Sequence, residues 1–255
     1  MPRIKLTLQY KGTNYLGWQV QPQGPTVQSV LEEKLSAIFK KKIITNVSGR
    51  TDAGVHALFQ VAHFDVEPFS MKPINLLMGL NSSLPADISV LKVQIVPSSF
   101  HAQRSVKKKV YQYTIFNSSI PSPFLTEYSW RVPYPLNIPA MRRAAKVLVG
   151  RHDFKSFCAS DSNVKTTVRR VDNILIRTGE PCVRPYSTGG AIITLTFTGP
   201  GFLKHMVRNM VGTLVDVGRG KLTEKDIQKI LKSRDRKKAG MTAPAYGLVL
   251  KKVMY

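Results

Sequence analysis

A short polar stretch between two apolar runs carries the side chains best suited to chemistry. Residues 48–57 have the sequence SGRTDAGVHA, and the flanking runs 43–47 and 58–66 are typical of strands. Asp52 is the only carboxylate in this turn, and it could serve as a nucleophile or a general base. The Asp-x-Gly pattern also suits a plain turn, in which the carboxylate accepts a backbone hydrogen bond and Gly54 supplies a positive φ. Residue types and spacing leave both interpretations open.

Three other chemistries fit the stretch less well. A two-carboxylate glycosidase needs an acid and a base flanking the bond, and Asp52 has no second acid near it in the sequence. Asp52 and His56 could bind a metal, but no third ligand of matching type lies nearby, so we expect no metal site. Ser48 or Thr51 could act as a nucleophile with His56, but that arrangement lacks a clear orienting acid.

The charge of the chain favours a polyanionic partner. Lys and Arg total 38 against 15 Asp and Glu, which gives a formal net charge of +23 at pH 7 and a pI near 10.2. The basic residues form clusters along the whole chain, so they could cover one face of a folded body. A protein with a basic surface and no such partner is the alternative that composition leaves open.

Cysteine usage and hydropathy indicate the cellular setting. Cys158 and Cys182 are the only two cysteines and neither lies in a CxxC pair, so we expect neither a structural zinc site nor a disulfide framework. No apolar run follows Met1, and no apolar span approaches the roughly 18 residues of a transmembrane helix. We therefore expect a cytoplasmic protein with no membrane partner.

Hydrophobic periodicity predicts a β-α-β-β-α-β order for the first half of the chain. The expected elements are strands near 4–10, 43–47, 58–66 and 88–96, and helices near 27–39 and 70–79. Thr26 and Ser70 are placed to cap the two helices. This order is the ferredoxin-like, or split βαβ, pattern.

The second half repeats this order with one helix inserted. The expected elements are strands near 106–117, 168–177, 190–198 and 247–253, and helices near 141–148 and 203–214, with a shorter helix that Thr223 and Asp226 begin as a capping box. The boundary between the halves should lie within residues 97–105, which divides the chain into domains 1–102 and 103–255.

These patterns predict an α+β protein with two ferredoxin-like (βαββαβ) halves. Their antiparallel sheets could join edge to edge, with helices mainly on one face of each sheet. A four-stranded sheet that leaves its other face open, with aromatic and basic residues exposed, is a common platform for RNA.

Six segments of the sequence are distinctive when taken together. They are Tyr10–Gln19 (YKGTNYLGWQ), Gly49–Ala57 (GRTDAGVHA), Phe100–Ala102 (FHA), Asp153–Phe157 (DFKSF), His205–Asn209 (HMVRN) and Tyr246–Leu248 (YGL). In composition and order they resemble the TruA-type tRNA pseudouridine synthases. The resemblance runs from residue 10 to residue 248, essentially the whole chain, and the RTDAGVHA segment is highly specific.

The resemblance implies a cofactor-free isomerase that acts on tRNA. Such an enzyme would break the N-glycosidic bond of a uridine on the 3′ side of the anticodon stem-loop, at tRNA positions 38–40. It would then turn the uracil and rejoin it to the ribose through carbon 5. The resemblance also implies a homodimer and two ferredoxin-like halves that meet at an active cleft.

Five residues match functional positions of that family. Asp52 matches the catalytic aspartate, which would attack the anomeric carbon of the ribose or act on the adjacent sugar proton. Arg50 would contact the RNA backbone and help extrude the base, and Arg208 would pair with the aspartate. Tyr111 would stack on the uracil and is a candidate to take the carbon-5 proton, while Leu248 would pack on the other face of the base. Without the motifs, Arg208 would equally suit a helix surface, and Tyr111 and Leu248 a core.

A catalytically silent RNA-binding protein is the second hypothesis. Composition and charge suit both hypotheses equally. The presence of Asp52 together with Arg208 and Tyr111 favours the enzyme, because binding alone has no need for a carboxylate in a surface that attracts phosphate. A metal-dependent nuclease, the third hypothesis, would need clustered carboxylates that this chain lacks.

Overall fold

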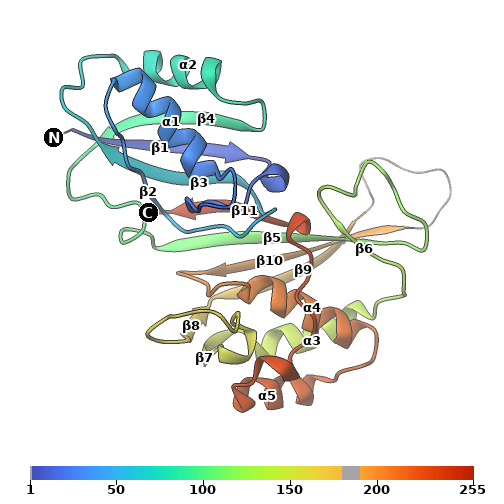
Figure 1. Ribbon diagram of the computed structural model, residues 1–255. Coiled ribbons are helices and arrows are strands. Elements are labelled where there is room, and N and C mark those ends of the chain that lie inside the picture. The colour runs from blue at the N-terminus through green and yellow to red at the C-terminus, as the bar shows by residue number, and fades with distance from the viewer. Residues whose placement is uncertain (1, 180–189) are drawn as a thin grey trace. The chain divides into compact units, whose positions relative to one another are not determined.

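The chain folds into two compact units that the computed structural model describes for residues 2–179 and 190–255 (Figure 1). Unit 1 comprises Met1–Lys107 and Val249–Tyr255, and unit 2 comprises Lys108–Leu248. Each unit combines helices with mostly antiparallel strands, so the predicted α+β class is confirmed. Cys158 is a buried free thiol, and Cys182 lies outside the described residues.

Unit 1 is built on a sheet whose central strands alternate as the sequence predicts. Its strands are β1 (Arg3–Tyr10), β2 (Asn46–Val47), β3 (His56–Asp65), β4 (Ile88–Val96) and β11 (Leu248–Met254). β1 pairs antiparallel with both β3 and β4, β2 pairs antiparallel with β3, and β11 pairs parallel with β3. Ile4, Leu6 and Leu8 are fully buried on one face of β1, so the predicted half-buried strand is confirmed.

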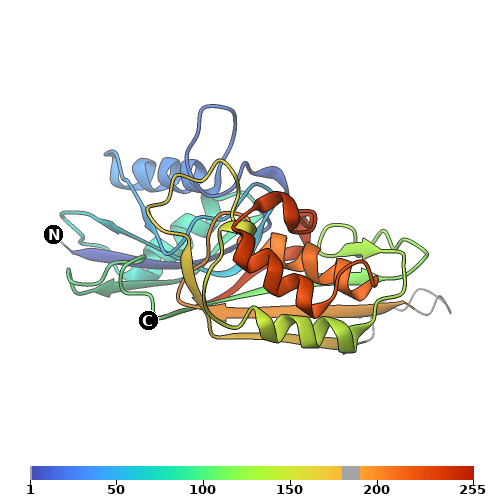
Figure 2. The same cartoon turned by 90° about the horizontal axis from the view of Figure 1, so that it is seen from below.

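Two helices accompany this sheet, and only one begins where the sequence predicts. α1 (Val27–Phe39) begins at Thr26, whose side chain forms a capping box with Ser29, and it lies along one face of the unit 1 strands (Figure 2). α2 (Pro73–Ser83) begins after Lys72, so the prediction of Ser70 as its cap was wrong. The proline occupies the first helical position and excludes the preceding residue from helical geometry.

The strands around the candidate turn differ from their predicted bounds. The strand expected at 43–47 is reduced to Asn46–Val47, and the one expected at 58–66 begins earlier, at His56. The turn between them therefore spans residues 48–55.

The described residues of unit 2 form three α-helices and a second set of strands. Its strands are β5 (Lys108–Asn117), β6 (Trp130–Val132), β7 (Gly150–Asp153), β8 (Val168–Val171), β9 (Asn173–Gly179) and β10 (Ala191–Gly199). Its helices are α3 (Ile138–Val147), α4 (Met206–Gly218) and α5 (Glu224–Ser233), which Figure 1 shows gathered on one side of β5, β10 and β9. β10 pairs antiparallel with β5 and β9, β6 runs parallel to β5, and β7 and β8 form a separate two-stranded sheet.

Three features of unit 2 differ from the predicted second half. The strand expected at 168–177 is split into β8 and β9 at Asp172, whose amide donates to Thr198 O (2.7 Å). β6 and β7 were not predicted. The expected final strand, β11, pairs parallel with β3 through Val249↔His56 and Leu250↔Ala57, and it belongs to unit 1 from Val249 onward. The broader expectation of two ferredoxin-like halves stays a prediction.

Across the described residues, no helix combines the length and apolarity needed to span a bilayer.

Candidate active site

Asp52 lies in the turn that joins β2 to β3. Its side chain is half-buried, and its carbonyl accepts a hydrogen bond from the Val55 amide (3.1 Å), which closes the turn. Gly54 has a φ of 76°, a conformation that favours glycine. Arg50 lies two residues earlier and is exposed. The turn thus presents a cation and a carboxylate from one short rigid segment.

The segment 12–18 holds this turn through backbone contacts. The Trp18 amide donates to Thr51 O (3.1 Å), and the Gly54 amide donates to Tyr15 O (3.3 Å). Gly17, at φ 89°, comes so close that a Cβ there would lie 2.5 Å from Thr51 O. A larger residue at this position would therefore displace the backbone next to Asp52.

His56 has a structural role at the end of the turn. It is buried, and its Nδ1 accepts a hydrogen bond from the Gly12 amide (3.0 Å). Nowhere in residues 2–179 and 190–255 do three or more His, Cys, Asp or Glu side chains come together as a possible metal site. His56 therefore serves to fix the turn against the segment that follows β1.

Arg208 lies in the first turn of α4 in unit 2. Its Nε donates to Ala243 O (2.8 Å), and the Ala243 amide donates to Arg208 O (3.2 Å). The side chain is half-buried, whereas the adjacent Val207 and Asn209 are buried, so Arg208 leaves the apolar stripe of the helix at its edge as predicted. This reciprocal pair of bonds fixes the arginine to the segment before β11.

Asn209 and Arg236 support this arrangement and were not predicted from the sequence. Asn209 is fully buried, and its Nδ2 donates to Phe157 O (2.8 Å). Its Oδ1 accepts from Arg236 Nη2 (2.9 Å) and from Thr242 Oγ1 (2.7 Å). An asparagine inside an otherwise apolar helical stripe is a signal that could have identified this residue. The contacts fix residue 242, next to the Ala243 that holds Arg208.

Tyr111 and Tyr113 are both buried side chains on one face of β5. Tyr111 lies opposite Phe197 on β10, and its ring meets the Phe202 ring edge-on at 5.4 Å. The Tyr113 hydroxyl donates to Pro244 O (2.8 Å), and burial raises the pKa of this phenol far above its usual value. Unit 2 thus links Tyr113 and Arg208 through the consecutive residues Ala243 and Pro244.

Leu248, the remaining candidate, begins β11 and is buried. It follows Gly247, where a Cβ would lie 2.6 Å from Tyr113 Cζ. This close approach requires glycine at the position before Leu248. Arg50 and Asp52 therefore belong to unit 1, while Tyr111, Arg208 and Leu248 belong to unit 2.

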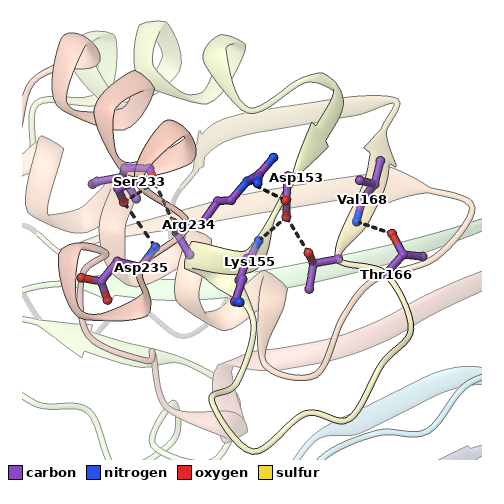
Figure 3. Close-up of polar contacts among 10 residues, drawn as sticks. Asp153, Lys155, Thr166, Val168, Ser233, Arg234 and Asp235 are labelled. Carbon is purple, nitrogen blue, oxygen red and sulfur yellow. Dashed lines mark hydrogen bonds and ion pairs between the residues drawn. The ribbon is translucent and has the colours of Figure 1, made fainter.

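The Asp153–Phe157 segment forms a scaffold within unit 2 (Figure 3). Asp153 accepts hydrogen bonds from the Lys155 amide (3.1 Å) and Thr167 Oγ1 (2.5 Å), and it forms an ion pair with Arg234 Nε (2.9 Å). Ser156 Oγ donates to Ile230 O (2.6 Å), which ties the segment to α5. These contacts join β7, β8 and α5, and the Asn209 bond to Phe157 extends them to α4.

Comparison with known proteins gives a consistent result. A family model described as tRNA pseudouridine synthase matches residues 7–103 and 144–255. A tRNA pseudouridine synthase A from Myxococcus xanthus is 44% identical over 255 residues, which cover 100% of this chain and 92% of the relative. Proteins of the same name from Pelobacter propionicus and Moorella thermoacetica are each 45% identical, with 100% of both chains covered.

Proposed function

The chain belongs to the tRNA pseudouridine synthase family, and from this we propose that it acts on the 3′ side of the anticodon stem-loop, at tRNA positions 38–40. The enzyme is an isomerase that converts uridine in tRNA to pseudouridine. We further propose that Asp52 is its catalytic carboxylate. The observation that carries this proposal is the matched turn 48–55, in which Asp52 is half-buried and held by backbone contacts on both sides.

The reaction needs neither an oxidant nor a second substrate. The bond between N1 of uracil and C1′ of ribose breaks, and a bond between C5 and C1′ forms. The proton on C5 leaves and N1 gains one, so the atoms balance within the nucleotide. Asp52 contributes either by attacking C1′ or by accepting the proton on the adjacent C2′ as the base departs. No cofactor is required by this scheme, and we propose none.

The other four candidates have roles that follow from their chemistry. Arg50 is exposed and can contact the phosphate backbone as the nucleotide is extruded. Tyr111 offers an aromatic face and Leu248 an apolar one, the usual pair of surfaces for a flipped base. Arg208, a guanidinium fixed at Ala243 O, is the proposed partner of the catalytic carboxylate.

Binding of tRNA follows from charge and chemistry together. A net charge of +23 suits a highly charged RNA, and we propose that the enzyme works as a cytoplasmic homodimer without a metal. A catalytically silent RNA-binding protein would share this charge. Only the silent protein would be indifferent to the loss of one half-buried carboxylate.

Asp52→Asn tests the proposal, because it keeps the shape of the side chain and removes its nucleophilic and basic oxygen. We expect the rate of pseudouridine formation to fall by more than about 1,000-fold, while the affinity for tRNA stays within about threefold. Pseudouridine is mapped by position in tRNA after incubation with each purified protein. Asp161→Asn is the matched control, since Asp161 is an exposed carboxylate outside the turn and forms an ion pair with Lys204 Nζ at 2.6 Å. A normal rate in Asp52→Asn would refute the assignment, and modification outside the anticodon stem-loop would refute the proposed substrate position.

A further inference from the structure

A buried glutamine on β3 contacts Ser48 and Gly49, two residues of the turn that carries Asp52. Gln60 is fully buried, and its Nε2 donates to Gly49 O (2.9 Å) and to the Tyr10 hydroxyl (3.2 Å). Its Oε1 accepts from Ser48 Oγ (2.6 Å) and from the Val61 amide (3.1 Å). Both hydrogens of the amide and both acceptor positions are therefore used, which leaves the side chain one orientation.

Tyr10 extends these contacts to the residue next to Asp52. Its hydroxyl lies 2.8 Å from Thr51 Oγ1, and both side chains are buried. Because Gln60 already donates to the phenol oxygen, the phenol hydrogen is available for Thr51. Burial raises the pKa of Tyr10 to about 12, so the phenol keeps this hydrogen at neutral pH.

The groups that hold the turn differ between the residues before Asp52 and the residues after it. The side chains of Gln60 and Tyr10 hold residues 48, 49 and 51, which precede Asp52, whereas backbone atoms of segment 12–18 hold residues 51 and 54. The side before Asp52 is thus held by two side chains, from the paired strands β3 and β1, in addition to backbone contacts. A turn held in this way keeps one backbone conformation at the carboxylate.

We propose that Gln60 and Tyr10 are positioning residues that set the backbone orientation of Asp52 for the isomerisation. This inference rests on the proposed function of Asp52. Neither residue needs to touch the substrate, since each acts through the backbone or hydroxyl of the turn. Misplacing a reacting group by about 1 Å can reduce a rate by about 100-fold, so the loss of either contact is expected to appear in the chemical step.

Gln60→Met and Tyr10→Phe test the proposal at two levels of disruption. The first removes every polar contact of the amide, and the second removes a single oxygen and is the safer variant for folding. We expect single-turnover rates to fall by about 10- to 100-fold in Gln60→Met and by about 3- to 10-fold in Tyr10→Phe. The dissociation constant for tRNA should change by less than about threefold. Amide hydrogen exchange of residues 49–54 should accelerate in both variants.

Gln28→Met is the matched control for stability. Gln28 is a second buried glutamine of unit 1, and it donates to Glu32 Oε1 (2.8 Å) and Thr45 O (3.3 Å) and accepts from the Val20 amide (3.3 Å). None of these partners lies within residues 48–55. Its substitution should lower the melting temperature by a similar amount and leave the rate within about threefold of the parent.

The outcomes separate this role from the function on which it rests. An inactive Asp52→Asn together with a fully active, folded Gln60→Met overturns the positioning role alone. An equal rate loss in Gln28→Met also overturns it, because rate would then follow general stability. A normal rate in Asp52→Asn removes the proposed function of Asp52, and the positioning role is overturned with it.

Discussion

The turn that contains Asp52 in unit 1 and the first turn of α4 in unit 2 are each held by a buried amide side chain. Gln60 and Asn209, each with its hydrogen-bond partners, are the anchors of these two turns. The two anchors differ in charge. In unit 1, the hydrogen-bond partners of Gln60 within the described residues are neutral: a serine, a tyrosine and backbone atoms. In unit 2, Asn209 accepts a hydrogen bond from the guanidinium of Arg236. The first anchor is neutral and the second contains a half-buried cation.

This difference fits the chemistry of the residue that each anchor supports. A fixed charge beside a carboxylate changes the free energy of its ionisation, and a neutral anchor adds no such charge. An arginine stays protonated over the whole working range of pH and tolerates a second guanidinium in its support. The comparison teaches that both residues are held by a buried amide, but only the amide in unit 2 has a charged hydrogen-bond partner among the described residues.

Placing a carboxylate in each anchor should give the largest difference in stability between the two anchors. Gln60→Glu buries an acid with no cation among its contacts, and we expect the free energy of unfolding to fall by about 4 kcal/mol at pH 8. Asn209→Asp places the new carboxylate where Oδ1 already accepts from Arg236 Nη2 at 2.9 Å. Its expected cost is about 1–2 kcal/mol, mainly for the lost donor to Phe157 O. Urea unfolding of both variants measures the two losses.

The pH dependence of Gln60→Glu gives a second check on this pair. Burial raises the pKa of the introduced carboxyl in the folded protein above the value near 4.3 of the unfolded chain. The penalty therefore grows as the pH rises between these two values and shrinks as the pH falls towards 5. Equal losses in the two variants, or a loss in Gln60→Glu that ignores pH, would contradict the neutral character assigned to the first anchor.

Arg236→Lys tests the unit 2 anchor, and its expected effect on stability and rate is of intermediate size. Arg236 donates through Nη2 to Asn209 and Thr242 and through Nη1 to Gly240 O, at 2.9 Å in each case. Lysine keeps the charge and loses the planar fork, so we expect a loss of about 2 kcal/mol in unfolding free energy and a rate about tenfold lower. The rate should fall because residues 242 and 243 hold Arg208.

Arg234→Lys, two residues away, is the control for this change. Arg234 pairs with Asp153 at 2.9 Å, but 67% of its side chain is exposed (Figure 3). A surface ion pair of this kind contributes less than about 1 kcal/mol, and lysine can retain it. A comparable loss of stability in both variants would show that the fork geometry of Arg236 has no special role.

The sequence predicted local structure well, but it did not specify which distant strands pair. The cap at Thr26, the capping box at Thr223 and the alternating core of β1 are local patterns, and the structure confirms them. The parallel pairing of β11 with β3 joins residues almost 200 positions apart, and no local pattern specifies it. The split at Asp172 likewise depends on a backbone bond to Thr198 of a neighbouring strand.

The candidate site shows the same difference between what local sequence predicts and what long-range contacts determine. Asp52, Arg208 and Tyr111 were proposed as site residues from the family resemblance, and each lies on the element expected to carry it. Gln60 and Asn209 are polar residues within apolar runs, and their roles were not predicted because their partners come from distant segments. A buried amide in a core element indicates that hydrogen-bond partners exist, but the sequence does not identify those partners.

Deleting one hydroxyl from each anchor gives the smallest and most direct test of the difference in charge. Thr51 Oγ1 pairs with the neutral Tyr10 hydroxyl at 2.8 Å, whereas Thr242 Oγ1 accepts from the Arg236 guanidinium at 2.9 Å and donates to Asn209 Oδ1 at 2.7 Å. Thr→Val keeps the shape, so we expect Thr51→Val to cost about 1 kcal/mol and Thr242→Val about 2 kcal/mol, since hydrogen bonds to charged groups are the stronger ones. Chemical unfolding measures both. Thr51→Ser and Thr242→Ser retain the hydroxyls and should recover most of each loss, and a reversed order of the two valine variants would show that charge does not set the strength of these anchors.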